Sequence, residues 1–198
     1  PLTLRINTLK ATKEEVIATL TEKGVEVAES RWAKDALVVH NLHALASCSL
    51  FKEGKIVPQD ESSQLAVLNL APSPGAKVID MCAAPGGKAT YMAQLMRNRG
   101  EIKAFDIHNH KIELLKEARQ RTGATIVEPA IGNGTIFQPE LENWADYVLV
   151  DAPCSGLGVL GRRPDARWQK NEDTIQQLAA LSRQILENAS RYVKRNGY

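Results

Sequence analysis

Residues 78–90, "VIDMCAAPGGKAT", decide the fold class of this sequence. The segment begins as a short apolar strand, passes through a turn of small residues and continues as a helix. Residues 83–87 carry little side-chain bulk, so a ligand can approach their backbone N–H groups closely. The spacing is neither the G-x-G-x-x-G pattern of dinucleotide sites nor a Walker loop, which counts against NAD and nucleoside triphosphates. The segment therefore predicts a ligand-binding loop between a strand and a helix.

Strands and helices alternate on the carboxyl side of this loop. The candidate strands are 77–81, 101–107, 124–131 and 146–152, and the candidate helices are 86–98, 110–122 and 171–195. This alternation predicts an α/β fold, a Rossmann-like, doubly wound and mostly parallel sheet with helices on both faces. Ligands of such sheets bind at the carboxyl ends of the strands. We therefore expect the loops after Met81, Asp106 and Asp151 to lie together.

Residues 1–58 read as a separate small α+β unit that precedes the domain of residues 59–198. Candidate strands are 2–7, 25–30 and 36–42, and Thr12 with Glu15 forms a capping-box pattern before a helix that Gly24 ends. A loop and a short helix over 62–70 lead into the second domain. Such a unit is either an RNA-binding platform or a structural appendage, and the pair of exposed aromatic residues that would stack bases is not evident.

Composition narrows the protein class. The 198 residues are 43% hydrophobic and 24% charged, as in ordinary globular proteins. No segment resembles a membrane span or a signal peptide, and the three cysteines have no metal-type spacing. We expect a cytoplasmic monomer without bound metal. Pro1 and Tyr198 both look like cut ends, because the chain lacks an initial methionine and stops where Gly197 ends a helix, so we expect a piece of a longer protein.

The loop and the next two strand ends suit an adenosine-type cofactor. Asp106 follows Gly86 by twenty residues and ends the second strand, where an acid can accept hydrogen bonds from both ribose hydroxyls. Asn133 follows the third strand and can read the exocyclic amine of adenine. The alternatives are a strand-terminating acid for Asp106 and a turn residue for Asn133. Without a pyrophosphate site, S-adenosyl-L-methionine fits better than NAD.

Residues 146–168, "DYVLVDAPCSGLGVLGRRPDARW", place an acid and a thiol after the fourth strand. Asp151 and Cys154 are either a capping acid with a buried, inert cysteine or a reactive pair in the crevice beside the cofactor loop. Methylation of a pyrimidine at carbon 5 needs a thiol, because that carbon attacks a sulfonium methyl group only after a thiolate adds to carbon 6. An acid at ring nitrogen 3 stabilises the charge that develops. The base must be unpaired or flipped.

The sequence resembles the RsmB/Sun (Fmu) family of RNA (cytosine-5)-methyltransferases, most closely the bacterial ribosomal-RNA type. The resemblance rests on "RINTLK", "QDESSQ", "DMCAAPGGK" and "VDAPCSGLGVLGRRPDARW", which occur in order over nearly the whole chain. It implies a methyltransferase fold, ribosomal RNA as partner and an RNA-recognition role for the amino-terminal unit. It implies S-adenosyl-L-methionine binding by Cys82, Ala83, Ala84, Pro85, Gly86, Gly87 and Lys88, with Asp106 at the ribose, Asn133 at the adenine and Asp151 at the methionine end or the target base.

Two departures from the family pattern qualify this resemblance. The family usually carries an acid where this chain has Asn133. The family also uses two cysteines: the one matching Cys154 is implied to assist release of the methylated RNA, and the nucleophile lies in a Thr-Cys segment on the following strand, which this sequence does not contain. The helical RNA-binding domain that often precedes this region is absent as well. We therefore expect the chain as given to lack turnover.

Two other functions stay open from the sequence. One is a DNA cytosine-5 methyltransferase in which Cys154 is itself the nucleophile, although nothing resembles a DNA target-recognition region. The other is a non-catalytic module that binds RNA or cofactor. Arg162 and Arg163 are candidates for steering the RNA backbone or ordering the loop, with a solvated surface as the alternative.

Overall fold

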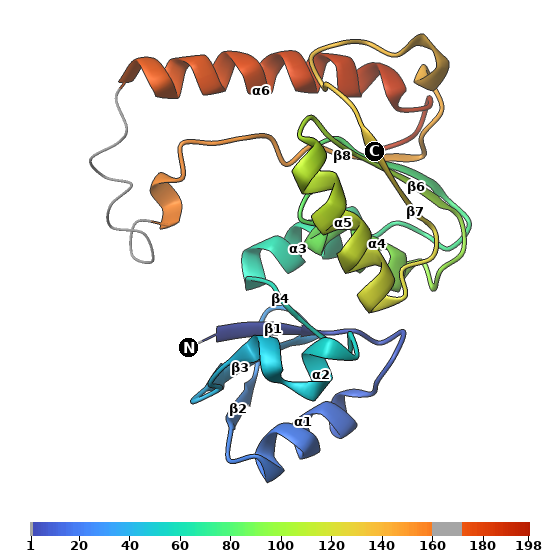
Figure 1. Cartoon of the computed structure of the whole chain (residues 1–198). Helices are drawn as coiled ribbons and strands as arrows, with labels where there is room; N and C mark the ends of the chain where they lie inside the picture. The colour runs from blue at the N-terminus through green and yellow to red at the C-terminus, as the bar shows by residue number, and fades with distance from the viewer. Residues whose placement is uncertain (1, 160–171) are drawn as a thin grey trace.

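The computed structural model describes residues 2–159 and 172–198, which form two four-stranded sheets. The amino-terminal sheet is antiparallel, and the second sheet is parallel. In Figure 1 the antiparallel sheet lies at the bottom, the parallel sheet above it, and the long helix α6 (Glu172–Tyr192) across the top. The parallel α/β sheet predicted from the sequence is confirmed.

The amino-terminal sheet has the strand order β2-β3-β1-β4. Its strands are β1 (Leu2–Ile6), β2 (Glu26–Glu29), β3 (Ala36–His40) and β4 (Ile56–Pro58), and its helices are α1 (Lys13–Glu22) and α2 (Ser49–Lys52). The Thr12 hydroxyl accepts a hydrogen bond from the Glu15 N–H (3.2 Å) and caps α1 as the sequence pattern predicts. Val16 and Leu20 of this helix then pack into the core beneath the sheet.

The parallel sheet has the strand order β7-β6-β5-β8. Its strands are β5 (Lys77–Asp80), β6 (Glu101–Asp106), β7 (Val127–Ile131) and β8 (Tyr147–Leu149), and its helices besides α6 are α3 (Glu61–Leu70), α4 (Gly87–Leu95) and α5 (Asn109–Thr122). Apolar residues of α3, α4 and α5 form one core with this sheet, and residues of α6 form a second. Helices therefore cover both faces, as in a doubly wound sheet.

Tyr198 pairs with β8 as a strand residue would. Its N–H donates to the Asp146 carbonyl (3.0 Å), and its carbonyl accepts from the Val148 N–H (2.8 Å). The ring of Tyr198 stacks on that of Tyr147. The helix α6 thus ends at Tyr192 and not at Gly197 as the sequence predicts, and the chain then runs beside β8.

Polar contacts join the two sheets. The Arg5 guanidinium on β1 donates to the Gly87 carbonyl (2.9 Å) and the Thr90 hydroxyl (3.0 Å) at the start of α4. The buried Asn7 amide donates to the carbonyls of Gly54 and Thr122, each at 2.8 Å.

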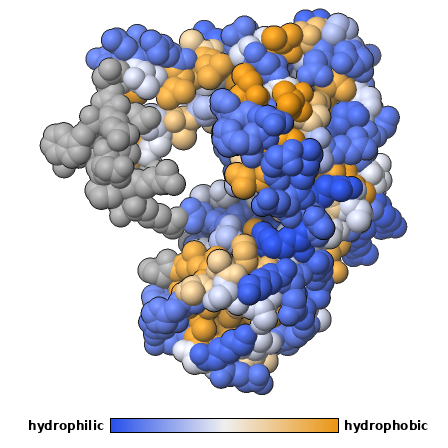
Figure 2. Space-filling model, viewed as in Figure 1, coloured by the Kyte–Doolittle hydropathy of each residue, from blue (hydrophilic) through white to orange (hydrophobic). Residues whose placement is uncertain are grey.

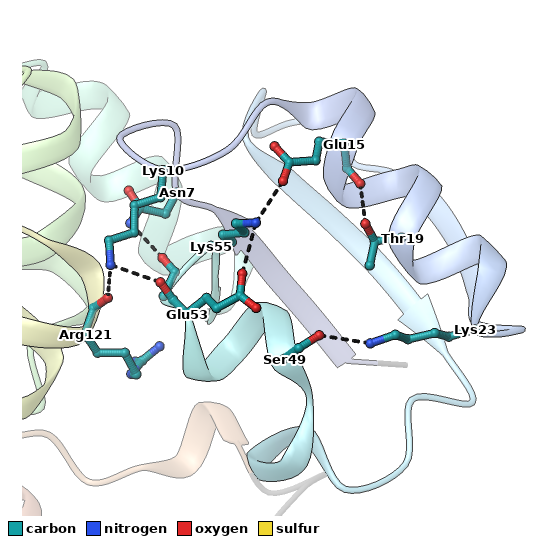
Figure 3. A network of polar contacts seen from close by, with 10 residues as sticks. Asn7, Lys10, Glu15, Thr19, Lys23, Ser49, Glu53, Lys55 and Arg121 are labelled. Carbon is teal, nitrogen blue, oxygen red and sulfur yellow. Dashed lines mark hydrogen bonds and ion pairs between the residues drawn. The ribbon is translucent and has the colours of Figure 1, made fainter.

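Figure 3 shows a further bridge between the sheets, at the surface. There Lys10 reaches from the amino-terminal unit to the Arg121 carbonyl near the end of α5 (2.7 Å) and also contacts the Glu53 carbonyl (3.0 Å). Together with the buried contacts, this bridge holds the amino-terminal sheet against the first turn of α4 and the end of α5.

The surface shown in Figure 2 is mostly hydrophilic, with apolar residues in small patches. Among the helices that the structure describes, none combines the length and the apolar content that crossing a membrane requires.

Candidate active site

The carboxyl ends of the parallel strands meet at one edge of the sheet, where they enclose a cavity of about 240 Å³, the sheet-edge cavity. Its lining residues come from the loops after β5, β6, β7 and β8, from the first turn of α5 and from α6: Met81, Cys82, Ala84, Asp106, Ile107, His108, Lys111, Gly132, Asn133, Gly134, Thr135, Asp151, Pro153, Leu181 and Ile185. The structure thus brings together the three loops that the sequence placed at one site, including the predicted residues Cys82, Ala84, Asp106, Asn133 and Asp151.

The loop between β5 and α4 is fixed by its own backbone. The Ala83 N–H donates to the Phe105 carbonyl, and the Gly86 N–H donates to the Ala83 carbonyl, each at 2.8 Å. Gly86 has a φ of +105°, and a Cβ there would lie 2.6 Å from the Leu115 side chain, so this position requires glycine. Because α4 begins at Gly87, the N–H groups of its first turn have no partners within the helix and can meet a ligand at the loop.

Asp106 and Asn133 take different environments in the sheet-edge cavity. Asp106 is 6% exposed at the end of β6, where its Oδ1 accepts from the His108 N–H (3.1 Å) and Lys111 Nζ lies 3.9 Å from its Oδ2. Asn133 Oδ1 accepts from the N–H (3.0 Å) and the hydroxyl (2.8 Å) of Thr135. Asn133 is therefore a turn residue, which was the alternative to a contact with adenine, and it also lines the cavity.

A second cavity of about 330 Å³, the inter-sheet cavity, adjoins the first. It lies between the amino-terminal unit and the loop before α4, and its lining residues are Leu2, Thr3, Pro58, Gln59, Asp60, Ser63, Cys82, Ala83, Ala84, Pro85, Gly87, Lys88 and Asp151. Cys82, Ala84 and Asp151 line both cavities. Lys88 Nζ donates a hydrogen bond to Asp151 Oδ2 on this shared wall.

Burial shapes the electrostatics around the shared wall. Burial raises the pKa of the Asp80 carboxyl, at the end of β5, to about 7, and Lys88 opposes this rise. Burial raises the pKa of the Cys82 thiol to about 11, and the neighbouring acids Asp80, Asp106 and Asp151 add to the effect. Cys82 is therefore a neutral thiol at pH 7 and a poor nucleophile.

The Asp151–Cys154 pair divides in the structure. Asp151 lines both cavities, whereas Cys154 is exposed and lines neither of them. The alternative interpretation of Cys154 as a buried cysteine is wrong. Arg162 and Arg163 belong to residues 160–171, which lie outside the described residues, so their predicted RNA contacts stay predictions.

Sequence reasoning missed the amino-terminal wall of the inter-sheet cavity. Gln59 and Ser63 belong to the "QDESSQ" segment, whose resemblance to the family predicts no role for these two residues. It also missed Trp32, which is 68% exposed, with the Arg31 guanidinium 5.6 Å from its ring centroid. Exposed tryptophan is a signal that sequence alone does not give, because burial depends on the fold.

Fold and site together define the class of protein. A parallel sheet with a small-residue loop after β5 and a buried acid at the end of β6 is the Rossmann-like fold of S-adenosyl-L-methionine-dependent methyltransferases. A family model described as 16S rRNA methyltransferase RsmB/F matches residues 67–198, and a second, described as an RsmF/B-like ferredoxin-like domain, matches residues 1–45. The chain belongs to the RsmB/F methyltransferase family, and the resemblance seen in the sequence is confirmed.

Individual relatives agree with this assignment. The probable ribosomal RNA small subunit methyltransferase B of Bacillus subtilis is 38% identical over 98% of this chain and 44% of its own length. The 28S rRNA (cytosine-C(5))-methyltransferase of Mus musculus is 36% identical over 96% of this chain and 24% of its own. A methyltransferase homolog protein from Pyrococcus horikoshii, known from a crystal structure, is 32% identical in sequence to this chain. The two structures superpose with a TM-score of 0.84, over 100% of this chain and 63% of the homolog. The chain thus spans less than half the length of both curated relatives.

Proposed function

We propose that this chain carries the cofactor site and the base site of an enzyme that transfers a methyl group from S-adenosyl-L-methionine to carbon 5 of a cytosine in ribosomal RNA. The observation that carries the proposal is the pair of adjoining cavities with a common wall of Cys82, Ala84 and Asp151. A methyl donor and a methyl acceptor need two such sites in contact. The names of the relatives supply the substrate class.

The sheet-edge cavity fits S-adenosyl-L-methionine. The buried Asp106 carboxylate would accept hydrogen bonds from the ribose hydroxyls, and the backbone of residues 82–88 would hold the methionine end. Asn133 Oδ1 already accepts two hydrogen bonds from Thr135. Asn133 would therefore contact adenine through its NH₂ group, which would donate a hydrogen bond to a ring nitrogen of the base. When bound, the cofactor supplies an electrophilic methyl group.

The inter-sheet cavity would hold the flipped cytosine against the shared wall. A thiolate that forms a bond with carbon 6 makes carbon 5 enamine-like, and carbon 5 can then accept a methyl group. Asp151, positioned by Lys88, would bring a proton into its hydrogen bond with ring nitrogen 3 and so neutralise the negative charge that the thiolate adds to the ring. Removal of the carbon 5 proton by a base returns the electron pair, and the bond between carbon 6 and sulfur breaks.

The thiols of this chain suit supporting roles. Cys82 keeps its proton because burial raises its pKa to about 11. Cys154 is exposed outside both cavities, and it matches the cysteine that assists product release in the family. We assign release to Cys154, and we assign the nucleophile to the Thr-Cys segment of the family, which is not part of this sequence.

The amino-terminal unit would contact RNA near the base site. Trp32 offers an exposed ring for base stacking, and Arg31 beside it offers a positive charge for phosphate. Ser30, at the start of the same loop, forms a hydrogen bond with Glu61, which follows Asp60 of the inter-sheet cavity. This contact ties the Trp32 loop to the segment that lines the cavity.

Titration calorimetry tests the cofactor site. The chain should bind S-adenosyl-L-methionine, and Asp106→Ala should weaken binding about 10- to 100-fold, because the ribose loses its charged acceptor. Glu128→Gln is the matched control, since Glu128 lies on β7 and does not line the cavity. Equal affinity of the parent and Asp106→Ala would contradict the assignment.

Trapping with 5-fluorocytidine RNA tests the thiol assignment. Fluorine at carbon 5 blocks the final proton removal, so any thiol that attacks carbon 6 stays attached to the RNA. With S-adenosyl-L-methionine present, this chain should form no adduct through Cys154. An adduct that Cys154→Ser abolishes would make Cys154 the nucleophile and favour the DNA-type mechanism.

A further inference from the structure

Arg5 is a buried cation at the contact between the amino-terminal sheet and α4. It begins the segment "RINTLK" on β1, and none of its surface is exposed. Its guanidinium donates to the Gly87 carbonyl (2.9 Å) and the Thr90 hydroxyl (3.0 Å), and it lies 4.6 Å from the centroid of the Tyr91 ring. The neighbouring acid, Asp35, accepts a hydrogen bond from the Tyr91 hydroxyl (2.9 Å). Buried charges usually pair with an acid, whereas Arg5 directs its donors to the first turn of a helix.

The two hydrogen bonds of Arg5 fix two peptide groups in that turn. Thr90 Oγ1, which accepts from Arg5, donates in turn to the Gly86 carbonyl (2.7 Å). Arg5 therefore holds the Gly87 carbonyl directly and the Gly86 carbonyl through Thr90. Because a peptide group is planar, the direction of each carbonyl sets the direction of the N–H group on the following residue. The N–H groups oriented in this way belong to Gly87 and Lys88.

These two N–H groups are available to a ligand. They lie in the first turn of α4, where the helix itself offers them no carbonyl. Gly87 and Lys88 line the inter-sheet cavity, next to the shared wall of Cys82, Ala84 and Asp151. N–H groups at a helix N-terminus favour an anion, and the methionine end of S-adenosyl-L-methionine carries a carboxylate. The charge of the guanidinium on the Gly87 carbonyl polarises that peptide group and strengthens the Lys88 N–H as a donor.

We propose that Arg5 is a positioning residue of the cofactor site, which orients the N–H groups of Gly87 and Lys88 for the carboxylate of S-adenosyl-L-methionine. This inference rests on the proposed function, in which the backbone of residues 82–88 holds the methionine end of the cofactor. Arg5 acts through the backbone of α4 and does not itself touch the cofactor. The amino-terminal unit thereby contributes to cofactor affinity as well as to RNA binding.

Two adenosine ligands distinguish this role from a purely structural one: S-adenosylhomocysteine, which carries the amino-acid end, and 5′-methylthioadenosine, which lacks it. Titration calorimetry gives the dissociation constant of each ligand for the 198-residue chain. Arg5→Met should weaken binding of S-adenosylhomocysteine about 10-fold and leave binding of 5′-methylthioadenosine unchanged, because only the first ligand has a carboxylate. Arg5→Lys keeps the charge but loses the planar fork, and it should weaken binding of S-adenosylhomocysteine about 3-fold.

Variants at two other positions serve as controls. Lys10 belongs to the same "RINTLK" segment and holds the Arg121 carbonyl (2.7 Å) at the end of α5. Lys10→Met should therefore leave both dissociation constants unchanged. Thr90→Val has nearly the same shape as the parent but breaks the link to Gly86, and it should weaken binding of S-adenosylhomocysteine about 3-fold. Thr90→Ser keeps the hydroxyl and should bind both ligands as the parent does.

The two ligands separate the possible outcomes. An Arg5→Met variant that loses affinity for both ligands equally, or for neither, would overturn the inference. If circular dichroism shows that Arg5→Met does not fold, Thr90→Val decides, and parental affinity of that variant for S-adenosylhomocysteine would overturn the inference. A parent that binds neither ligand would overturn the proposed cofactor site as well.

Discussion

Asp80→Asn should make the protein more stable at pH 8 and leave its stability unchanged near pH 4. Asp80 ends β5 with 1% of its surface exposed, and burial raises its pKa from 3.8 to about 7. Between these two values the folded protein keeps a proton that the unfolded chain has released, so the free energy of unfolding falls as pH rises. Below pH 3.8 both states are protonated, and the contribution of Asp80 to stability is fully present.

The magnitude follows from the interval between the two pKa values. At about 1.36 kcal/mol per pH unit, the rise from 3.8 to about 7 corresponds to about 4 kcal/mol lost by pH 8. Asparagine has nearly the same shape and does not ionise. The variant should therefore exceed the parent by up to about 4 kcal/mol at pH 8.

Urea unfolding followed by circular dichroism at pH 4, 6 and 8 measures the difference between parent and variant, in which contributions of the other acids largely cancel. Asp146→Asn is a control of opposite sign, because the hydrogen bond from Lys194 lowers the pKa of Asp146 and the acid stabilises the fold above that pKa. An Asp80→Asn variant whose advantage is the same at pH 4 and pH 8, or that is less stable at pH 8, would refute the reasoning.

Three further predictions concern the loop, the thiols and the RNA surface. Gly86→Ala should lower the free energy of unfolding by about 3 kcal/mol, through the left-handed backbone and a steric clash; Gly75→Ala, with positive φ and no clash, should cost about 1 kcal/mol by urea unfolding. Iodoacetamide at pH 7.5 should alkylate the exposed Cys154 well before Cys82, as mass spectrometry would show, and equal rates would contradict the raised pKa of Cys82. Trp32→Ala should weaken binding of a fluorescently labelled pentaribonucleotide, AACAA, about 10-fold without changing cofactor affinity, as fluorescence anisotropy would show. An unchanged RNA affinity would remove Trp32 from the site.

The sequence predicted the parallel sheet well because its signals are local. Strands β5 and β6 are each followed by a helix, α4 and α5, and the chain order of such units fixes the edge at which their loops meet. For this reason Asp106, Asn133 and Asp151 could be placed around one cavity before the structure was known. The environments of these residues were less predictable: the Asn133 side chain is engaged with Thr135, a contact that depends on the exact turn.

The amino-terminal wall could not be predicted in the same way. Strand β4 has only three residues and lies where the sequence predicts a loop, and the four-residue helix α2 has no counterpart among the predicted elements. The pairing of β4 with β1 joins residues more than fifty positions apart, with Leu4 opposite Pro58. That pairing places Gln59 against the cofactor loop, so the inter-sheet cavity is a product of tertiary structure.

The Asn7 amide has a consequence for how the molecule unfolds. One NH₂ group donates both of its hydrogens, one to Gly54 in the amino-terminal unit and the other to Thr122 at the end of α5. Separation of the two sheets would break both hydrogen bonds and leave this buried amide and two carbonyls without partners. The sheets should therefore melt in a single cooperative transition, and amide hydrogen exchange in β1 should be as slow as in β5.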